Sequence, residues 1–364
     1  MSDLVKYALA AVVEGKQLSM DEARAAMGSV MDGEATPAQL AALLVALRMR
    51  GETIEELAGF AAAMRDRVLK VDAPEGAIDT CGTGGDKSGT FNISTAAALV
   101  VASGGVPVAK HGNRAVTSAC GSADVLEALG IRTDMNPQEA AQSLRSNNWA
   151  FLFAPGYHPA MKHAGPTRKE IGVRTAFNLL GPITNPAGAR RQVVGVGDAA
   201  AAPRLAEVLR MLGAERALVV HGDGIDELPL DGTGVLYDVT PSGVTRHEVV
   251  AADLGLTPAP MSAFAGGAPA QNAAAVEAVL GGNRGPGRDV VLLNAAAGFL
   301  VAGRAKDLRE GVALAAKAID CGSSNELLAR LRADKIANDD AKAEAAATST
   351  QAQPETRETQ ATPA

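Results

Sequence analysis

Residues 79–95 read Asp79-Thr-Cys-Gly-Thr-Gly-Gly-Asp86-Lys-Ser-Gly-Thr-Phe-Asn92-Ile-Ser94-Thr95, and an alanine-rich apolar run follows them. Four glycines within eight positions predict a backbone that bends sharply or approaches a ligand closely, because glycine is costly to order. Asn92, Ser94 and Thr95 are residue types that begin helices, and the run after them is rich in helix formers. The loop therefore leads into a helix N-terminus, whose free N–H groups and dipole favour a phosphate.

The spacing of these glycines fits neither GxxxxGK[ST] nor GxGxxG, which argues against an ordinary ATPase or a nicotinamide enzyme. A short strand, residues 106–109, follows the expected helix, and Lys110, His111, Asn113 and Arg114 come at its end. Ligands of α/β sheets bind at the carboxyl ends of strands. We therefore expect these polar side chains to lie beside the glycine loop.

Four motifs together resemble the anthranilate phosphoribosyltransferase family, within the nucleoside phosphorylase and phosphoribosyltransferase superfamily: Gly82-Thr-Gly-Gly-Asp86, Asn92-Ile-Ser-Thr95, Lys110-His-Gly-Asn-Arg114 and Gly121-Ser122-Ala-Asp124. The resemblance covers about residues 4–336. It implies transfer of the 5-phosphoribosyl group from phosphoribosyl pyrophosphate to the amine of anthranilate. The products would be N-(5-phosphoribosyl)anthranilate and pyrophosphate, in the second step of tryptophan biosynthesis from chorismate.

Composition limits the make-up of the core, the possible partners and the cell compartment of the protein. Hydrophobic residues make up 47% of the 364 residues but aromatic ones only 3%, so the core must consist mainly of alanine, valine and leucine. The net charge of −7 disfavours nonspecific binding to nucleic acid or to an anionic membrane. Cys81, Cys120 and Cys321 are widely spaced and indicate free thiols in a reducing compartment. Without a signal-like segment or a spanning apolar run, we expect a cytoplasmic protein.

The first 72 residues predict about four helices and no strand. Capping-box pairs stand at Ser19 with Glu22, at Thr36 with Gln39 and at Thr53 with Glu56. From residue 73 the pattern alternates, with strands predicted at 149–153, 193–196 and 217–221 and a helix at 203–212. Such alternation favours a mostly parallel sheet.

The expected fold is α/β: a small N-terminal all-helical domain and a larger domain whose central, mostly parallel sheet is flanked by helices. We assign residues 1–72 to the first and residues 73–158 and 191–337 to the second, which would bind phosphoribosyl pyrophosphate. Stretches 159–164 and 171–180 look helical, and the resemblance returns about residues 159–190 to the helical domain. Residues 338–364 lack periodic apolar positions, so we expect a disordered tail.

The resemblance also implies a donor site. The glycine loop would offer backbone donors to the pyrophosphate, Asp86 would position the ribosyl end, and Lys110 would place a compact positive charge on a phosphate. The full predicted set for phosphoribosyl pyrophosphate is Gly82, Thr83, Gly84, Gly85, Asp86, Lys87, Thr90, Asn92, Ser94, Thr95, Lys110, His111, Gly112, Asn113 and Ser122.

A metal site is predicted at Asp226 and Glu227, which follow the strand at 217–221. Adjacent carboxylates at a strand end suit Mg²⁺, which binds one or two carboxylates together with phosphate and water oxygens. The resemblance implies two Mg²⁺ ions bound with phosphoribosyl pyrophosphate, with Ser94 as the third protein ligand.

For the acceptor, the resemblance places a carboxylate-binding arginine at Arg168, whose guanidinium fork suits a carboxylate. The predicted anthranilate set is Gly82, His111, Asn113, His158, Arg168 and Gly181. The aromatic amine is neutral at pH 7 and can attack without a strong base. We therefore name no catalytic acid or base and expect positioning and electrostatic stabilisation to dominate.

Several alternatives stay open at this stage. A pyrimidine nucleoside phosphorylase, a nucleic-acid-binding relative without catalysis and a structural or regulatory protein compete with the enzyme, although intact Asp226 and Glu227 and the acidic charge disfavour them. Arg114 could bind phosphate or pair with a carboxylate.

The resemblance implies a homodimer through the helical domain. Apolar residues there could be its contacts or could equally be core: Leu9, Val12, Leu43, Leu44 and Leu47.

Overall fold

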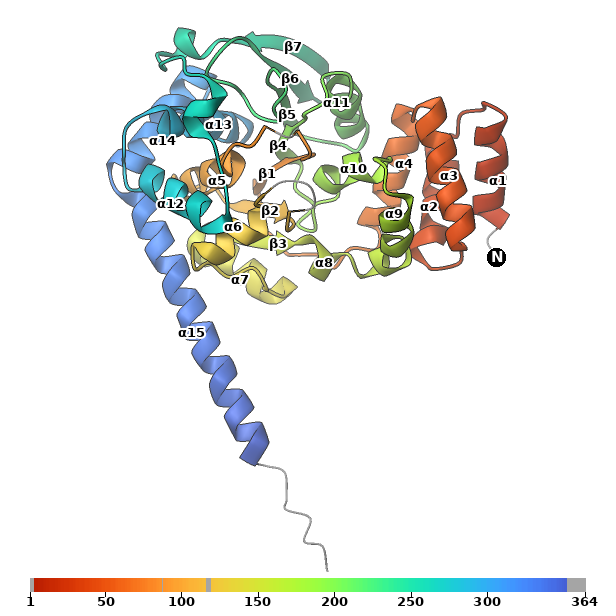
Figure 1. Cartoon of the computed structure of the whole chain (residues 1–364), viewed down its shortest axis with the longest axis horizontal. Coiled ribbons are helices and arrows are strands. Elements are labelled where there is room, and N and C mark those ends of the chain that lie inside the picture. The colour runs from red at the N-terminus through yellow and green to blue at the C-terminus, as the bar shows by residue number, and fades with distance from the viewer. Residues whose placement is uncertain (1–2, 87, 116–118, 352–364) are drawn as a thin grey trace, which may run out of the picture.

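The computed structural model describes residues 3–86, 88–115 and 119–351. The described chain has a small helical bundle at one end and a larger α/β part beside it (Figure 1). The bundle contains four helices: α1 (Asp3–Val13), α2 (Met20–Met31), α3 (Pro37–Arg50) and α4 (Ile54–Arg65). The sequence analysis predicted this number and type of element.

All three predicted capping boxes are present in the bundle. Ser19, Thr36 and Thr53 each accept a hydrogen bond from the backbone N–H three residues on, and the side chain there returns one. Each box satisfies two backbone donors that the helix itself leaves free. These local signals explain why the helix starts could be read from the sequence.

Burial decides between the two interpretations left open for five apolar residues of the helical bundle. Leu43, Leu44 and Leu47 are fully buried and Val12 is 3% exposed, so these four side chains pack inside the bundle. Leu9 is half-buried against the same core. They are therefore core residues and not surface contacts for a second copy.

A seven-stranded sheet forms the centre of the α/β part, in the order β3-β2-β1-β4-β5-β6-β7. The first five strands in this order are parallel, and β6 and β7 add an antiparallel hairpin at one edge that we did not predict. The strands are β1 (Ile78–Gly82), β2 (Val108–Gly112), β3 (Trp149–Phe153), β4 (Arg191–Gly195), β5 (Arg216–His221), β6 (Gly234–Thr240) and β7 (Gly243–Val249).

Alternate strand residues point to opposite faces of this sheet and pack into three separate hydrophobic clusters, one of them built on β2, β3 and the helix α7 (Pro137–Asn147). Val193 and Leu218 pack with the helices α5 (Ile93–Ser103) and α13 (Pro286–Val301). Val194 and Val219 pack instead with α11 (Ala202–Met211) and the helical bundle. The remaining helices of eight or more residues in the described chain are α12 (Pro269–Leu280), α14 (Leu308–Asp320) and α15 (Ser323–Gln351).

The chain returns to the bundle after β3 and the short helix α8 (Ala154–Tyr157). The 3-10 helix η1 (Pro159–His163) contacts α2, and α9 (Gly165–Ile171) contacts α3. The single helix expected over 171–180 is not formed. Gly172 ends α9 in a left-handed conformation with φ of 69°, and helix resumes only in α10 (Phe177–Leu180).

Two arginines join the bundle to the α/β part through backbone carbonyls. Arg65, at the end of α4, donates to the carbonyls of Ile183 (2.8 Å) and Leu212 (3.4 Å). Arg204, in the first turn of α11, donates to the carbonyl of Glu52 at 3.0 Å. The carbonyls that Arg65 binds lie at the ends of other helices, where the helix leaves them without a partner.

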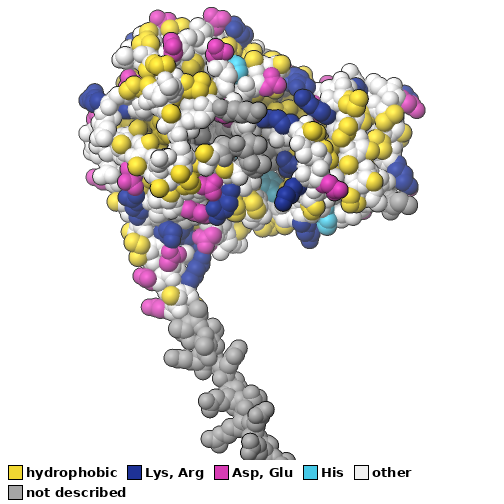
Figure 2. All heavy atoms as spheres, in the orientation of Figure 1, with side chains coloured by type: hydrophobic (Ala, Val, Ile, Leu, Met, Phe, Trp, Pro, Cys, Tyr) yellow, Lys and Arg dark blue, Asp and Glu magenta, His cyan; other side chains and the backbone are white. Residues whose placement is uncertain are grey.

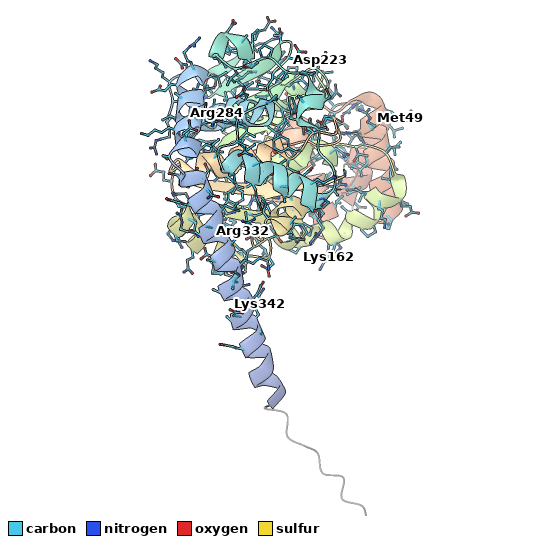
Figure 3. The ribbon with its side chains drawn as sticks, turned by 60° about the vertical axis from the view of Figure 1, so that its left-hand side comes forward. Met49, Lys162, Asp223, Arg284, Arg332 and Lys342 are labelled. Carbon is cyan, nitrogen blue, oxygen red and sulfur yellow. The ribbon has the colours of Figure 1, made fainter. Side chains whose placement is uncertain are left out.

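The end of the chain also differs from expectation. The α15 helix continues to Gln351 and projects from the body of the molecule, so the disordered tail predicted from residue 338 is wrong for residues 338–351 (Figures 1 and 3). This stretch is rich in alanine, and it extends a helix that is already nucleated by packed residues. Residues 352–364 lie outside the described part.

No helix in the described ranges is long and apolar enough to cross a membrane.

Glu56 offers a test of the bundle's stability. Its buried carboxylate accepts from the backbone N–H of Leu18 and of Thr53, both at 2.9 Å, and pairs with Arg50. Glu56→Ala leaves these donors and a half-buried cation without their acceptor, so we expect a loss of about 3 kcal/mol in stability. Differential scanning calorimetry should show a clearly lower Tm, with the exposed neighbour Glu55→Ala as control. Equal melting of the two variants would contradict this role.

Candidate active site

A cavity of about 530 Å³ lies between the helical bundle and the carboxyl ends of β1 and β2. Every residue predicted for the acceptor lines this one cavity, although the six come from five separate places in the chain. Its wall includes Gly82, His111, Asn113, His158, Arg168 and Gly181, together with Met64, Thr83, Pro155, Lys162, Phe177 and Asn178.

Arg168 is one of two cationic residues that line this cavity without an ion pair in the described structure, the other being the exposed Lys162. Arg168 belongs to α9, and its guanidinium carbon lies 4.6 Å above the centre of the Phe177 ring. No carboxylate of the described residues lies within ion-pair distance of it, and burial lowers its pKa. A half-buried cation with no internal counter-charge favours an anionic ligand, and its planar fork matches a carboxylate.

His111 and His158 form a pair of neutral imidazoles on the same wall. Their Nε2 atoms are 3.2 Å apart, and His111 Nδ1 lies 3.1 Å from the carbonyl oxygen of Gly181. That carbonyl can only accept, so His111 Nδ1 carries a proton. Burial lowers the pKa of His111 to about 3 and that of His158 to about 4. Neither ring can act as a charged acid at neutral pH.

The glycine loop and the loop carrying Asp226 meet at very close range. Gly84 donates its backbone N–H to Asp226 Oδ2 at 3.0 Å. A side-chain carbon at Gly82 would overlap the Asp226 carboxylate, and one at Gly195 would overlap the Asp226 backbone carbonyl. The two predicted halves of the donor site can therefore approach only because both strand ends are glycine.

Glu227 lies next to the start of α5. Its Oε1 accepts from the backbone N–H of Ser94 at 3.0 Å, so the predicted metal ligands Ser94 and Glu227 are neighbours. Burial raises the pKa of both Asp226 and Glu227, and the nearby carboxylate of Asp86 adds to the shift at Asp226. Buried carboxylates that repel one another would be relieved by a cation.

These residues fit Mg²⁺. Asp226 Oδ2 and Glu227 Oε1 each accept from a backbone N–H, and the second oxygen of each carboxylate remains to ligate a cation. No cluster of three His, Cys, Asp or Glu side chains occurs in the described ranges. This agrees with the usual Mg²⁺ site, in which substrate and water oxygens complete the coordination of one or two carboxylates.

Lys110 lies deeper than the sequence analysis expected. It is 2% exposed and donates from Nζ to the carbonyl of Thr80 at 2.5 Å, beneath the glycine loop. Burial lowers its pKa, and the carboxylates of Asp79 and Glu227 oppose that shift. Thr95 is also buried, at 1% exposed. Neither side chain lines the acceptor cavity, and their predicted contact with phosphate stays a prediction.

The other predicted donor residues surround the glycine loop. Asn92 bridges two segments, since it donates to the carbonyl of Cys120 (3.1 Å) and accepts from Asn272 (2.9 Å). Ser122 donates to the carbonyl of Asn113 at 3.2 Å, beside Gly112, and Thr90 pairs with Ala265 in an isolated bridge. Lys87 lies outside the described residues.

Arg114 had two open interpretations, and the structure favours one. Its guanidinium donates to Asp124 (3.1 Å) and to both carboxylate oxygens of Glu127 (2.8 and 2.6 Å). Asp124 in turn accepts from the backbone N–H groups of Ala115 and Gly121, both at 2.9 Å. Arg114 therefore pairs with carboxylates and holds the turn before the helix α6 (Ser122–Ala128).

Sequence reasoning missed several wall residues. Phe177 and Asn178 reach the cavity from the returning segment, and Met64 reaches it from the bundle, so only the tertiary fold brings them there. Gly195 did carry a signal, because a glycine inside a strand pattern often marks a close backbone approach.

The helical bundle, the mostly parallel sheet and a glycine loop beside paired carboxylates define a glycosyl transferase. The "Glycosyl transferase family, helical bundle domain" matches residues 6–68, and the "Glycosyl transferase family, a/b domain" matches residues 74–325. An anthranilate phosphoribosyltransferase of Symbiobacterium thermophilum is 52% identical over 330 residues, which are 90% of this chain and 97% of the relative. The chain belongs to the anthranilate phosphoribosyltransferase family.

Solved structures of this family have the same fold. The enzyme from Thermus thermophilus superposes with a TM-score of 0.86 at 45% identity, covering 90% of this chain and 99% of that one. The Saccharomyces cerevisiae enzyme in complex with PRPP and Mg has a TM-score of 0.84 at 26% identity, covering 93% of this chain and 99% of the yeast chain. Another structure of the yeast enzyme contains 4-fluoroanthranilate.

The neutral histidine pair predicts a pH dependence. In the folded chain the pKa is about 3 for His111 and about 4 for His158, both below the ordinary value of 6.5. Between pH 6.5 and these lower values, the unfolded chain therefore binds more protons than the folded chain. Stability from this pair is complete above pH 6.5 and is lost as pH falls toward 4. Asp226 and Glu227, with raised pKa values, act in the opposite direction, so the variant His158→Gln must be compared with the wild type.

This pH dependence is checked by measuring the melting temperature with differential scanning fluorimetry from about pH 7 to about pH 4.5. We expect the drop in Tm on acidification to be smaller in His158→Gln, because one buried imidazole no longer has to stay neutral. The exposed His247→Gln on β7 is the matched control. An unchanged or steeper pH slope in His158→Gln would contradict the neutral pair.

Proposed function

We infer that the chain is a Mg²⁺-dependent anthranilate phosphoribosyltransferase of tryptophan biosynthesis. The observation that carries this inference is the single cavity that joins the unpaired cation of Arg168 to the glycine loop at Gly82 and Thr83. A carboxylate at Arg168 would direct an aromatic amine toward a phosphoribosyl group held at the loop. The bound ligands in the solved structures of the yeast relative support both halves of this site.

The donor is held in this proposal by the glycine loop and the carboxylates beside it. Backbone N–H groups of the loop and of the start of α5 bind the pyrophosphate, and Asp86 orients the ribosyl end. Ser94, Asp226 and Glu227 hold two Mg²⁺ ions, which supply charge neutralisation for the departing pyrophosphate. The family structures with Mg support the metal, and the remaining oxygens of Asp226 and Glu227 support the positions.

The chemistry follows from positioning. A bond forms between the amine nitrogen and the anomeric carbon, while the bond from that carbon to the pyrophosphate oxygen breaks and the electron pair leaves with pyrophosphate. The amine gives its proton to solvent. Because His111 and His158 are neutral and the amine is uncharged, no protein group needs to act as general acid or base.

The same proposal covers the organisation of the chain. Residues 1–72 with the returning stretch 159–190 form one domain, and residues 73–158 and 191–337 form the other. Contacts of η1 with α2 and of α9 with α3 support the first grouping. The described structure leaves Cys81, Cys120 and Cys321 as free thiols, in keeping with a reducing cytoplasm.

A homodimer through the helical bundle is the proposed assembly. Large apolar side chains are exposed along α1 and α3, which contact one another, and Met49 is 84% exposed at the outer end of the bundle (Figure 3). The other exposed large apolar side chains of these two helices are Leu4, Tyr7 and Val13 in α1 and Val45 in α3. A second copy placed here would bury an apolar patch that is otherwise unfavourable in water.

Light scattering coupled to gel filtration tests the dimer. We expect Tyr7→Glu/Met49→Glu to elute as a monomer, because two charges would be buried in the interface. Met211→Glu changes an exposed methionine on α11 and should stay dimeric. A monomeric wild type, or a double variant that remains dimeric, would remove this interface from consideration.

The reaction is tested by the fall in anthranilate fluorescence when phosphoribosyl pyrophosphate and Mg²⁺ are present. We expect turnover by the wild type and its loss in Asp226→Asn/Glu227→Gln, because neutral side chains cannot hold the cation. Asp231→Asn, in the same loop region, is the control. Activity that survives in the double variant would reject the metal assignment and leave the reaction standing.

The acceptor half is tested in the same assay. Arg168→Gln should raise the KM for anthranilate roughly tenfold to a hundredfold with a smaller change in kcat, since a hydrogen bond to a charged group contributes about 1.5–3 kcal/mol. The control is Lys169→Gln, which changes the exposed side chain next to Arg168 in sequence and should leave the KM for anthranilate at the wild-type value. An unchanged KM in Arg168→Gln would mean that the carboxylate binds elsewhere.

A further inference from the structure

Asn294 is a polar side chain in the middle of an apolar stretch of α13. Charged side chains are spread over the face of the molecule seen in Figure 2, whereas α13 is buried along most of its length. Its middle reads Val290-Val-Leu-Leu-Asn294-Ala-Ala-Ala, and Asn294 is 4% exposed. Asparagine is a poor helix former, and burying its amide costs free energy unless the polar atoms are bonded. The partners of this amide therefore show what the residue does.

The Asn294 amide forms a two-way pair with the backbone of Leu228. Its Oδ1 accepts from the Leu228 N–H at 2.9 Å, and its Nδ2 donates to the Leu228 carbonyl at 3.0 Å. Nδ2 also donates to the carbonyl of Val290 at 2.9 Å, one turn earlier in α13. Leu228 is fully buried, so solvent cannot replace this partner. The pair therefore fixes the two peptide groups on either side of the Leu228 Cα.

This pair lies directly beside a proposed metal ligand. Leu228 follows Glu227, so one of the two fixed peptide groups is the one that joins these residues. The Glu227 side chain is held as well, since its Oε1 accepts from the Ser94 N–H at 3.0 Å. Asn294, Glu227 and Ser94 line one small cavity of about 10 Å³. Asn294 therefore acts on Glu227 through a single peptide group.

The helix that carries Asn294 also supports the other side of this site. α13 packs against α5, whose first turn contains Ser94. The two helices approach so closely that a side-chain carbon at Gly298 would lie 2.7 Å from Val101 Cγ2. Tightly packed helices move little relative to one another. A hydrogen-bonded pair from α13 to Leu228 thus fixes Glu227 relative to Ser94.

We propose that Asn294 is a positioning residue for the divalent cation, because it holds the backbone at Leu228 and so presents the Glu227 carboxylate to Mg²⁺. This inference rests on the proposed function, in which Glu227 and Ser94 bind that ion. Asn294 itself touches neither the ion nor the substrates. Groups that orient metal ligands in this way commonly change metal affinity by about tenfold to a hundredfold when they are removed.

The test compares Asn294→Ala with the wild type. The smaller side chain leaves space for water to bond the freed backbone groups of Leu228, so we expect a folded variant with a lower Tm. The matched control is Asn147→Ala, which removes another buried asparagine, from α7, whose amide donates to Asp334 at 2.7 Å. Two quantities are measured: the rise in Tm as Mg²⁺ is titrated at a fixed, high concentration of phosphoribosyl pyrophosphate, and the KM for anthranilate at saturating Mg²⁺.

We expect the Mg²⁺ concentration at the half-maximal rise in Tm to increase about tenfold to a hundredfold in Asn294→Ala, because Glu227 is no longer held in place. The KM for anthranilate should be unchanged, since Asn294 does not line the acceptor cavity. Asn147→Ala should lower Tm and keep the wild-type dependence on Mg²⁺. In the ligand-free wild type, the Leu228 amide should exchange slowly with deuterium.

Four results would overturn the proposal: an unchanged Mg²⁺ dependence in Asn294→Ala, the same increase in Asn147→Ala, failure of Asn294→Ala to fold, or fast exchange of the Leu228 amide. The first three would leave Asn294 with a structural role alone. Failure of the proposed function is a separate result, because the wild type would then show no turnover and no Mg²⁺-dependent rise in Tm.

Discussion

The close approach of two glycines to Asp226 is the constraint on which the site depends. Gly82 ends β1 and Gly195 ends the adjacent parallel strand β4, and a side chain on either would occupy space taken by Asp226. Their absence lets the loop after β5 fold over the sheet edge until the Asp226 carboxylate accepts from Gly84. The glycine loop and the carboxylates proposed as metal ligands are thus fixed relative to one another before any ligand arrives, which is the preorganisation that electrostatic catalysis requires.

Beneath this contact lies a layer of buried polar groups that also fixes the acceptor wall. Asp79, fully buried in β1, accepts from the backbone N–H of His111 at 3.1 Å, and burial raises its pKa. Gln192 in β4 donates to the carbonyl of Pro182 at 2.8 Å, next to Gly181. The histidine pair and the turn at Gly181 are therefore held by the same two strands that carry the close-approach glycines. Buried hydrogen-bonded networks of this kind make one geometry strongly preferred.

Local signals explain how much of this could be predicted from the sequence. Capping boxes, strand alternation and the glycine loop depend on neighbouring residues, and they placed the bundle helices and the parallel strands correctly. The acceptor set came from the family resemblance, and its six residues line one cavity. Features set by tertiary packing were missed. Nothing nearby in sequence distinguishes Leu43 in the core from Met49 on the surface, or reveals that Phe177 stacks on Arg168. The depth of Lys110 follows from how β1 and β2 pair, which a motif does not contain.

Arg65 gives the junction between the two parts of the molecule an unusual chemical character. It holds the bundle to the α/β part through the carbonyls of Ile183 and Leu212 and not through a carboxylate. Burial lowers its pKa only to about 10, so neither partner changes charge at any pH the cell reaches. Surface pairs of the bundle, such as Arg24 with Asp66, weaken as salt is added. The Arg65 contact is hydrogen-bonded and largely shielded from the solvent, so this part of the junction does not depend on the acidity or the salt content of the medium, unlike the contact of Arg204 with Glu52.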